Sequence, residues 1–342
     1  MTMTHAPMNP ETPSVAPFPS LADIRATAGR LAGKVLATPV WRWQTGAAAT
    51  RLAPSTEVWL KLELWQTTGS FKLRGALNCI EALDADAKQR GIVAASAGNH
   101  AIAAAYAARI AGTSATVVMP QHASPLRIAT CEGFGAKVVL VKNVHEAFAG
   151  AQALVADEGR TMIHPFDGPL TSQGTATVGL EFMQQVPQLD AVVVPVGGGG
   201  LISGIAAAVK QINPDCRVYG VEPFGADAMY RSFQAGEPVK LDAVDTIADS
   251  LGAPYALAYS FGVCRRFVDE IVRVSDDDLC RGMHDLFIDM KLAVEPAPAA
   301  AVAALFGPLK ERLDGRRVGL VMCGSNIDAA RHAELVARGK PA

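Results

Sequence analysis

The sequence predicts an α/β protein with two domains, built on mostly parallel, twisted sheets that helices cover. Short β-branched runs alternate with helical stretches, and this alternation is typical of parallel sheets wound with helices. Most predicted strands are continuously apolar, as expected for strands that are buried on both faces. The chain has 342 residues, of which 50% are hydrophobic, and it contains enough strand–helix units for two sheets. We therefore expect a ligand-binding cleft between them.

The predicted elements begin after residue 20. Residues 1–20 are rich in Pro and Thr and poor in core-forming side chains, so we expect a disordered tail. Continuously apolar or β-branched runs predict strands at residues 58–63, 92–96, 115–120, 136–141, 162–166, 191–196, 217–222, 271–275 and 318–323. Ala-rich segments predict helices at 101–110, 201–211 and 299–305. The sequence contains no internal repeat and no clear Gly/Ser linker.

Composition excludes several classes of function. The formal net charge is −2, and no basic stripe is present, so nucleic acid is not expected as a partner. The six cysteines are scattered, with no Cys-x-x-Cys pair and no zinc motif, so we expect reduced thiols in a cytoplasmic protein and no metal site. No apolar run reaches membrane-spanning length, and the start does not read as a secretory signal.

A run of four glycines, Gly197, Gly198, Gly199 and Gly200, follows a predicted strand and precedes an Ala-rich helix. Backbone N–H groups can converge on an anion there, and the helix start adds positive potential. A phosphate is the natural occupant. The run fits neither the dinucleotide fingerprint nor the Walker loop.

Two further turns follow predicted strands. Ser96, Ala97, Gly98, Asn99 and His100 form a loop before a helix, where N–H donors could hold a carboxylate, although Ser-x-Gly-Asn also reads as a simple helix cap. The second turn places the thiol of Cys323 at the end of an apolar strand. Such a cysteine can be a small core residue or a weak donor to a ligand ring nitrogen.

Lys72 stands after a Gly-Ser turn at a predicted helix start. The helix dipole and burial both disfavour its protonated form. A lysine amine that is partly neutral is a nucleophile, and it forms a Schiff base with carbonyl compounds. Together with the phosphate and carboxylate loops and the thiol, it supplies what pyridoxal phosphate (PLP) and an amino acid would require.

The order of these motifs resembles fold-type II PLP enzymes, in the serine/threonine dehydratase branch, over residues 20–330. The resemblance is carried by residues 70–76, 96–101, 197–200, 294–297 and 323–326. It implies a tryptophan synthase β-like fold, in which residues 21–85 and 166–342 form the large PLP-binding domain and residues 86–165 an inserted small domain. It also implies a homodimer or homotetramer.

The resemblance also implies the residue roles. Lys72 would hold PLP and then remove the Cα proton of the substrate amino acid. The Ser96–His100 loop, comprising Ser96, Ala97, Gly98, Asn99 and His100, would bind the substrate carboxylate. The cofactor-binding residues would be Phe71, Lys72, Asn99, Gly197, Gly198, Gly199, Gly200, Leu201, Glu295 and Cys323, with Cys323 facing the pyridine nitrogen.

Cys323 bears on the choice of reaction. A thiol with an ordinary pKa of about 8.5 cannot keep the pyridine protonated as a carboxylate would. The ring is then a weaker electron sink, and expulsion of a β-substituent is favoured over racemisation or transamination. We therefore predict an ammonia-lyase that converts a β-hydroxy amino acid to a 2-oxo acid and ammonia. A cysteine synthase-like β-replacement enzyme is the alternative, although such enzymes typically carry a threonine after the asparagine of this loop, where this chain has His100. A racemase or a non-catalytic binding protein is less favoured.

The chain departs from the family pattern at several positions. Racemases of the branch have a proton-donating serine where this chain has Ala97, which disfavours racemisation. Metal-binding relatives have a second carboxylate where this chain has Ala228, so that a cation site beside Glu222 is in doubt unless Asp227 replaces it. Trp65, Ser250 and Pro298 are also unusual. The substrate therefore stays open among threonine, serine, phenylserine and hydroxyaspartate.

Overall fold

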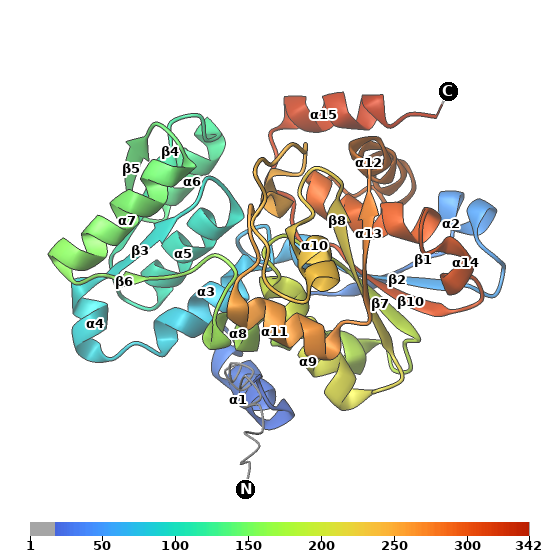
Figure 1. The fold of residues 1–342 in the computed structure, drawn as a ribbon, viewed down its shortest axis with the longest axis horizontal. Coiled ribbons are helices and arrows are strands. Elements are labelled where there is room, and N and C mark those ends of the chain that lie inside the picture. Colours follow the sequence, from blue (N-terminus) through green and yellow to red (C-terminus); the bar gives the residue numbers. More distant parts are fainter. Residues whose placement is uncertain (1–17, 342) are drawn as a thin grey trace, which may run out of the picture.

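The structure, a computed structural model, describes residues 18–341 as two sheets with helices around them (Figure 1). The first is a six-stranded sheet, in the order β1 (Val40–Trp43), β2 (Glu57–Lys61), β10 (Arg317–Val321), β7 (Ala191–Pro195), β8 (Arg217–Pro223) and β9 (Glu270–Val274). The second is a four-stranded sheet, in the order β5 (Lys137–Val141), β4 (Ala115–Pro120), β3 (Ile92–Ala95) and β6 (Thr161–Met162). Every pairing is parallel except that of β1 with β2. The predicted α/β class with parallel sheets is confirmed.

Helices stand between most of the strands along the chain. They are α1 (Leu21–Leu31), α2 (Gly46–Arg51), α3 (Lys72–Glu81), α4 (Ala85–Arg90), α5 (Asn99–Ile110), α6 (Pro125–Gly133), α7 (Val144–Glu158), α8 (Pro169–Gln185), α9 (Gly200–Ile212), α10 (Ala228–Ala235), α11 (Ala258–Phe267), α12 (Asp276–Met290), α13 (Pro296–Phe306), α14 (Lys310–Leu313) and α15 (Ala329–Arg338), with short 3₁₀ turns η1 (Glu63–Trp65) and η2 (Asp249–Leu251). None of those in residues 18–341 is long and apolar enough to cross a membrane.

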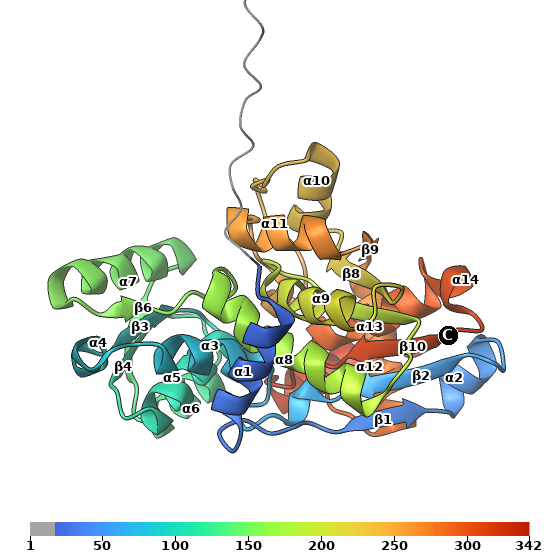
Figure 2. The ribbon, with the colours of Figure 1, turned by 90° about the horizontal axis from the view of Figure 1, so that it is seen from below.

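Each sheet has its own hydrophobic core. Strands β3, β4 and β7 are buried along their whole length, as their continuous apolar runs predict. Figure 2 shows α7 on one face of the four-stranded sheet and α5 and α6 on the other. Helix α3 packs against both α5, which follows β3 of the four-stranded sheet, and α8, which precedes β7 of the six-stranded sheet. It therefore lies between the two sheets.

The strands of the four-stranded sheet all lie between residues 92 and 162, and those of the six-stranded sheet lie outside this range. The domain boundaries at residues 85 and 165 stay predictions. The carboxyl ends of parallel strands meet at one edge of their sheet. The Ser96–His100 loop follows β3 at this edge of the four-stranded sheet. The glycine run and Cys323 follow β7 and β10 at the corresponding edge of the six-stranded sheet.

Three expectations need correction. The predicted strand at residues 162–166 is only two residues long, because Nδ1 of His164 accepts hydrogen bonds from the N–H groups of Phe166 and Asp167 and turns the chain. The antiparallel edge strand β1 was not predicted. The predicted tail is too long: Phe18 packs edge-on against Phe267 at 4.8 Å, and Ser20 caps α1. The rest of that tail, residues 1–17, lies outside the described residues.

Candidate functional site

Lys72 is the first residue of α3, and the segment after β10 fixes where this helix begins. The N–H of Phe71 donates to the carbonyl of Cys323 at 3.1 Å. Ser70 pairs with Gly324 in an isolated antiparallel bridge. The predicted helix start is therefore present, and backbone contacts hold it beside the residue that the sequence analysis assigned to the cofactor ring.

The amine of Lys72 is bonded to a backbone carbonyl group. Its Nζ donates to the carbonyl of Pro165 at 2.6 Å, and none of the hydrogen bonds and ion pairs found for Lys72 within residues 18–341 involves a carboxylate. Burial lowers the pKa of Lys72 to about 8, although the nearby Cys323 and Glu295 act in the opposite direction. At pH 7, about a tenth of the amine is then neutral, which is far more than for a solvated lysine.

A cavity opens at Lys72, and its lining includes Phe71, His100, Pro165 and Gly200. The structure thus brings together the lysine, the last glycine of the glycine run and the last residue of the Ser96–His100 loop. Asn99, Glu295 and Cys323 are outside this lining. Asn99 and Glu295 are bonded to each other instead, and the carbonyl of Cys323 accepts from Phe71 in the lining.

Two histidines in the cavity wall are held neutral. The Nε2 of His100 lies 2.8 Å from the carbonyl of Ile163, which can only accept, so this nitrogen carries the hydrogen. Burial and the charge of Lys72 lower the pKa of His100 to about 3. Burial also lowers the pKa of His164 to about 4. Because Nδ1 of His164 accepts two backbone N–H groups, its hydrogen is on Nε2.

The glycine run leads from β7 into α9. Gly199, with φ of +90°, precedes the first residue of that helix, and this conformation favours glycine. A Cβ atom at Gly200 would lie 2.3 Å from the carbonyl oxygen of Phe166, and one at Gly198 would lie 2.3 Å from its ring. Side chains are therefore excluded from this turn, and the start of α9 leaves N–H groups suited to an anion.

Asn99 connects several segments through its side-chain amide. Its Nδ2 donates to Oε1 of Glu295 at 2.7 Å and lies 3.4 Å from the hydroxyl of Ser250, while its Oδ1 accepts from Nδ2 of Asn326 at 2.7 Å. Glu295 is buried, and burial raises its pKa to about 7, with the charge of Asp249 adding to the effect. Asn99 thus joins α5 of the four-stranded sheet to loops of the six-stranded sheet.

Cys323 lies just after β10 with a buried side chain. Burial raises the pKa of its thiol well above the ordinary value, and the charge of Glu295 acts in the same direction. The thiol is therefore neutral at physiological pH. It can act as a weak donor and cannot supply a negative charge.

Arg127 is a residue of this region that sequence reasoning missed. It lies on α6 and donates to the carbonyl of Asn326 at 2.8 Å and to Asp249 at 2.7 Å, and it approaches the carbonyl of Ala97 at 3.5 Å. Within the loop, Ser96 Oγ accepts from the N–H of Gly98 at 3.2 Å. No local pattern signals Arg127, because its partners are more than a hundred residues away or on another loop.

His164 and Pro165 were also missed as site residues, since residues 162–166 were assigned to a strand. The signal was available: Pro165 has no N–H group, and a proline at such a position argues against a central strand. Of the three unusual residues, Ser250 is near Asn99, whereas Trp65 is 45% exposed and Pro298 is buried in the first turn of α13.

The two carboxylates considered for a cation have other partners. Glu222 accepts from the N–H groups of Met229 and Tyr230 at 3.0 and 2.6 Å, and burial raises its pKa to about 8. Asp227 pairs with Arg231 and Arg273, each at 2.8 Å. Among the residues from 18 to 341, no group of three His, Cys, Asp or Glu side chains is placed to hold a metal ion.

The chain is similar in sequence and in structure to known proteins. The profile of a family described as "Pyridoxal-phosphate dependent enzyme" matches residues 32–324. The chain is 49% identical to a phenylserine dehydratase of Ralstonia pickettii over 322 residues, which are 94% of this chain and 98% of that protein. It is 36% identical to an L-threo-3-hydroxyaspartate ammonia-lyase of Saccharomyces cerevisiae, over 93% of this chain and 96% of that one. A threonine deaminase of T.th. has a similar structure, with a TM-score of 0.85 and 38% identity over 91% of this chain and 99% of that one.

Proposed function

The chain belongs to the family of pyridoxal-phosphate dependent enzymes and is an ammonia-lyase that acts on β-hydroxy-α-amino acids, and we propose that its preferred substrate carries an aromatic side chain, as phenylserine does. The products are a 2-oxo acid and ammonia. The observation that carries the lyase chemistry is the amine of Lys72, which has no acidic partner among the described residues and shares a cavity with Gly200 at the start of α9.

The residues present fit the cofactor. Lys72 offers a nucleophile with a lowered pKa, and the glycine run offers a helix start without side chains. Two buried oxygens near this region, Oγ of Ser70 and Oε2 of Glu295, lack a partner among the described residues. Unsatisfied buried polar atoms are uncommon in folded proteins, and a bound polar group would satisfy them.

When bound, PLP supplies an aldehyde for an amine and a ring that accepts the electron pair left at Cα. Nζ of Lys72 would hold the cofactor through its aldehyde and, as a free amine of lowered pKa, would accept the Cα proton of the substrate. N–H groups of residues 197–201 would hold the phosphate. Those of the Ser96–His100 loop would hold the substrate carboxylate. Phe71 would pack against the cofactor ring, and Asn99, whose amide Glu295 orients, would bond to its phenolic oxygen.

The neutral thiol of Cys323 supports elimination over the other reactions of the fold. Beside the ring nitrogen, the thiol would offer a weak S–H donor and no counter-charge, and this would favour departure of the β-hydroxyl group, which leaves as water when it is protonated. Ala97 has no hydroxyl group to protonate the opposite face of Cα, which disfavours racemisation. His100 follows Asn99 where cysteine synthases carry a threonine, which disfavours β-replacement.

Two observations favour an aromatic substrate over an acidic one. Phe166, which touches the glycine run, forms a tilted ring pair with Tyr255 at 6.0 Å and an edge-on contact with His164 at 4.7 Å. An aromatic substrate ring can extend such a cluster. Arg127, the cation beside the Ser96–His100 loop, is already paired with Asp249. A second carboxylate on the substrate would compete with Asp249.

The proposal is tested by measuring 2-oxo acid and ammonia release from phenylserine, threonine, serine and hydroxyaspartate. We expect kcat/KM to be highest for phenylserine. Lys72→Ala should lose both product release and the visible absorbance of the bound cofactor, whereas Lys142→Ala, at an exposed position, should retain both. Equal or better turnover of hydroxyaspartate would overturn the substrate proposal, and full activity of Lys72→Ala would overturn the role of the lysine.

We also propose a cytoplasmic location and a homodimeric or homotetrameric assembly. All six cysteines are free thiols, which suits a reducing compartment. Light scattering of the purified protein would test the assembly.

A further inference from the structure

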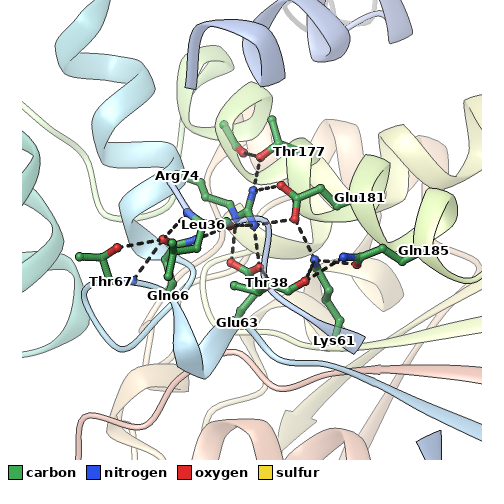
Figure 3. Close-up of polar contacts among 11 residues, drawn as sticks. Leu36, Thr38, Lys61, Glu63, Gln66, Thr67, Arg74, Thr177, Glu181 and Gln185 are labelled. Carbon is green, nitrogen blue, oxygen red and sulfur yellow. Dashed lines mark hydrogen bonds and ion pairs between the residues drawn. The ribbon is translucent and has the colours of Figure 1, made fainter. Parts of the chain in front are cut away.

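Three fully buried charged side chains cluster at Arg74, which is in the helix that carries Lys72. Lys61, Glu63 and Arg74 have no exposed side-chain surface, and Glu181 beside them is 18% exposed. We call these four residues the Arg74 network (Figure 3). Two cations face two anions, so that the network is neutral as a whole.

Every nitrogen of the Arg74 guanidinium group has a partner. It donates to both oxygens of Glu63, each at 2.8 Å, and to both oxygens of Glu181, at 2.6 and 2.8 Å. The carbonyl of Leu36 and the hydroxyl of Thr177 accept from it at 3.0 and 3.1 Å. Such a planar fork holds two carboxylates at once, and a lysine ammonium group cannot reproduce this geometry.

These partners come from different elements around α3. Glu63 is in η1 and Glu181 is in α8, while Arg74 itself is two residues after Lys72. Helix α8 begins a few residues after Pro165, whose carbonyl accepts from Lys72. The guanidinium group of Arg74 thus links the first turn of α3, which carries Lys72, to α8, which follows Pro165, the acceptor of the Lys72 amine.

The backbones of α3 and α8 also touch. A Cβ atom at Gly174 on α8 would lie 2.4 Å from the carbonyl oxygen of Arg74. The two helices therefore meet without side chains between them at this point, and a small shift of the first turn of α3 would move Lys72 relative to Pro165.

Stability alone is a weak reason for such a network. Desolvation of buried ions offsets most of their attraction, and buried ion pairs can often be replaced by apolar residues without loss of stability. What an apolar core would not provide is a fixed direction for the first turn of α3. Productive geometry at a reacting centre depends on displacements of about 1 Å.

We propose that Arg74 is a positioning residue for Lys72, because it clamps the first turn of α3 to η1 and α8 and so fixes where the amine lies. This inference rests on the proposed role of Lys72. The Arg74→Lys variant keeps the buried charge and removes the fork. Thr177→Val removes one partner of Arg74 without changing any charge.

The test compares holoenzymes of these variants with Lys61→Met. Lys61 belongs to the network and bonds to Glu181 and to the carbonyl of Thr38, but it is on β2 and does not contact α3 through these bonds. Tm, kcat, KM and the pH profile of kcat are measured for each. Hydrogen exchange of the first turn of α3 is measured in parallel.

We expect Arg74→Lys to lower kcat by about tenfold or more with KM changed by less than about threefold, since the amine is misplaced while the substrate site is intact. The acid limb of its pH profile should move to higher pH, because a loosened amine is better solvated. Thr177→Val should show a smaller loss of kcat. Lys61→Met should lower Tm while keeping kcat and the pH profile.

Other outcomes overturn the inference. If Arg74→Lys keeps the kcat and pH profile of the wild type, or if Lys61→Met loses as much kcat at the same loss of Tm, the network is only structural. If Arg74→Lys does not fold, unchanged kcat in Thr177→Val has the same meaning. If the wild type releases no 2-oxo acid, the proposed function fails instead. Hydrogen exchange then decides on Arg74, because Arg74→Lys must speed exchange in α3 more than Lys61→Met does.

Discussion

Glu295 gives the sharpest quantitative prediction, because its carboxyl group is buried in the predicted cofactor site. Its Oε1 accepts from Asn99 at 2.7 Å, and its Oε2 has no partner among the described residues. Burial raises its pKa from 4.5 to about 7. The variant Glu295→Gln keeps an acceptor for Asn99 and removes the titration.

Proton linkage gives the direction in which the free energy of unfolding changes with pH. Between pH 4.5 and about 7 the folded chain holds a proton on Glu295 that the unfolded chain has lost. The free energy of unfolding therefore falls as the pH rises through this window. With these two pKa values, the contribution of Glu295 falls by about 2.5 kcal/mol from pH 5 to pH 8.

The assay is urea unfolding of the cofactor-free chain at pH 5 and pH 8. The difference in unfolding free energy, wild type minus Glu295→Gln, should drop by about 2 to 3 kcal/mol between these pH values. Glu334→Gln, which changes an exposed carboxylate on α15, should follow the wild type. If Glu295→Gln has the same pH dependence as the wild type, the carboxyl group is not held protonated, and the reasoning is wrong.

Two further predictions concern the cofactor. Gly200→Ala places a Cβ atom 2.3 Å from the carbonyl oxygen of Phe166, so the start of α9 must move, and equilibrium dialysis should show PLP affinity lowered by about tenfold or more. The control Gly133→Ala, which has open space around the new methyl group, should bind PLP normally. Normal PLP binding by Gly200→Ala would contradict the phosphate site. Capture of PLP by the cofactor-free chain should quicken about tenfold per pH unit below pH 8 and level off above it, because the pKa of Lys72 is lowered to about 8 and only the neutral amine reacts. A capture rate, followed by absorbance, that still rises about tenfold between about pH 8 and pH 9 would show an ordinary lysine.

Helix starts and buried strands could be predicted from the sequence, because one short segment contains all the residues that determine each of them. The glycine run, the Ser96–His100 loop and Lys72 each combine a strand or turn with a helix start, and the structure has α9, α5 and α3 beginning at Gly200, Asn99 and Lys72. The buried strands were found because both-face burial leaves continuous apolar runs. The roles of these residues with the cofactor stay predictions.

Contacts between distant residues could not be predicted in this way. Arg74 is 107 residues from Glu181, and Arg127 is 199 residues from Asn326. The residues near either arginine in the sequence do not indicate its partner, because these contacts form only when the two sheets pack together. The edge strand β1 was missed because it is only four residues long, Arg42 interrupts its apolar run, and only Trp43 is buried.

The account depends most on Lys72 as the residue that carries the cofactor. Borohydride reduction of the holoenzyme fixes the cofactor to its lysine, and tryptic peptides then identify that lysine by mass spectrometry. We expect the phosphopyridoxyl group on the peptide of residues 62–74, uncut after Lys72 and ending at Arg74. Its presence on another lysine instead, such as Lys61, would contradict the account.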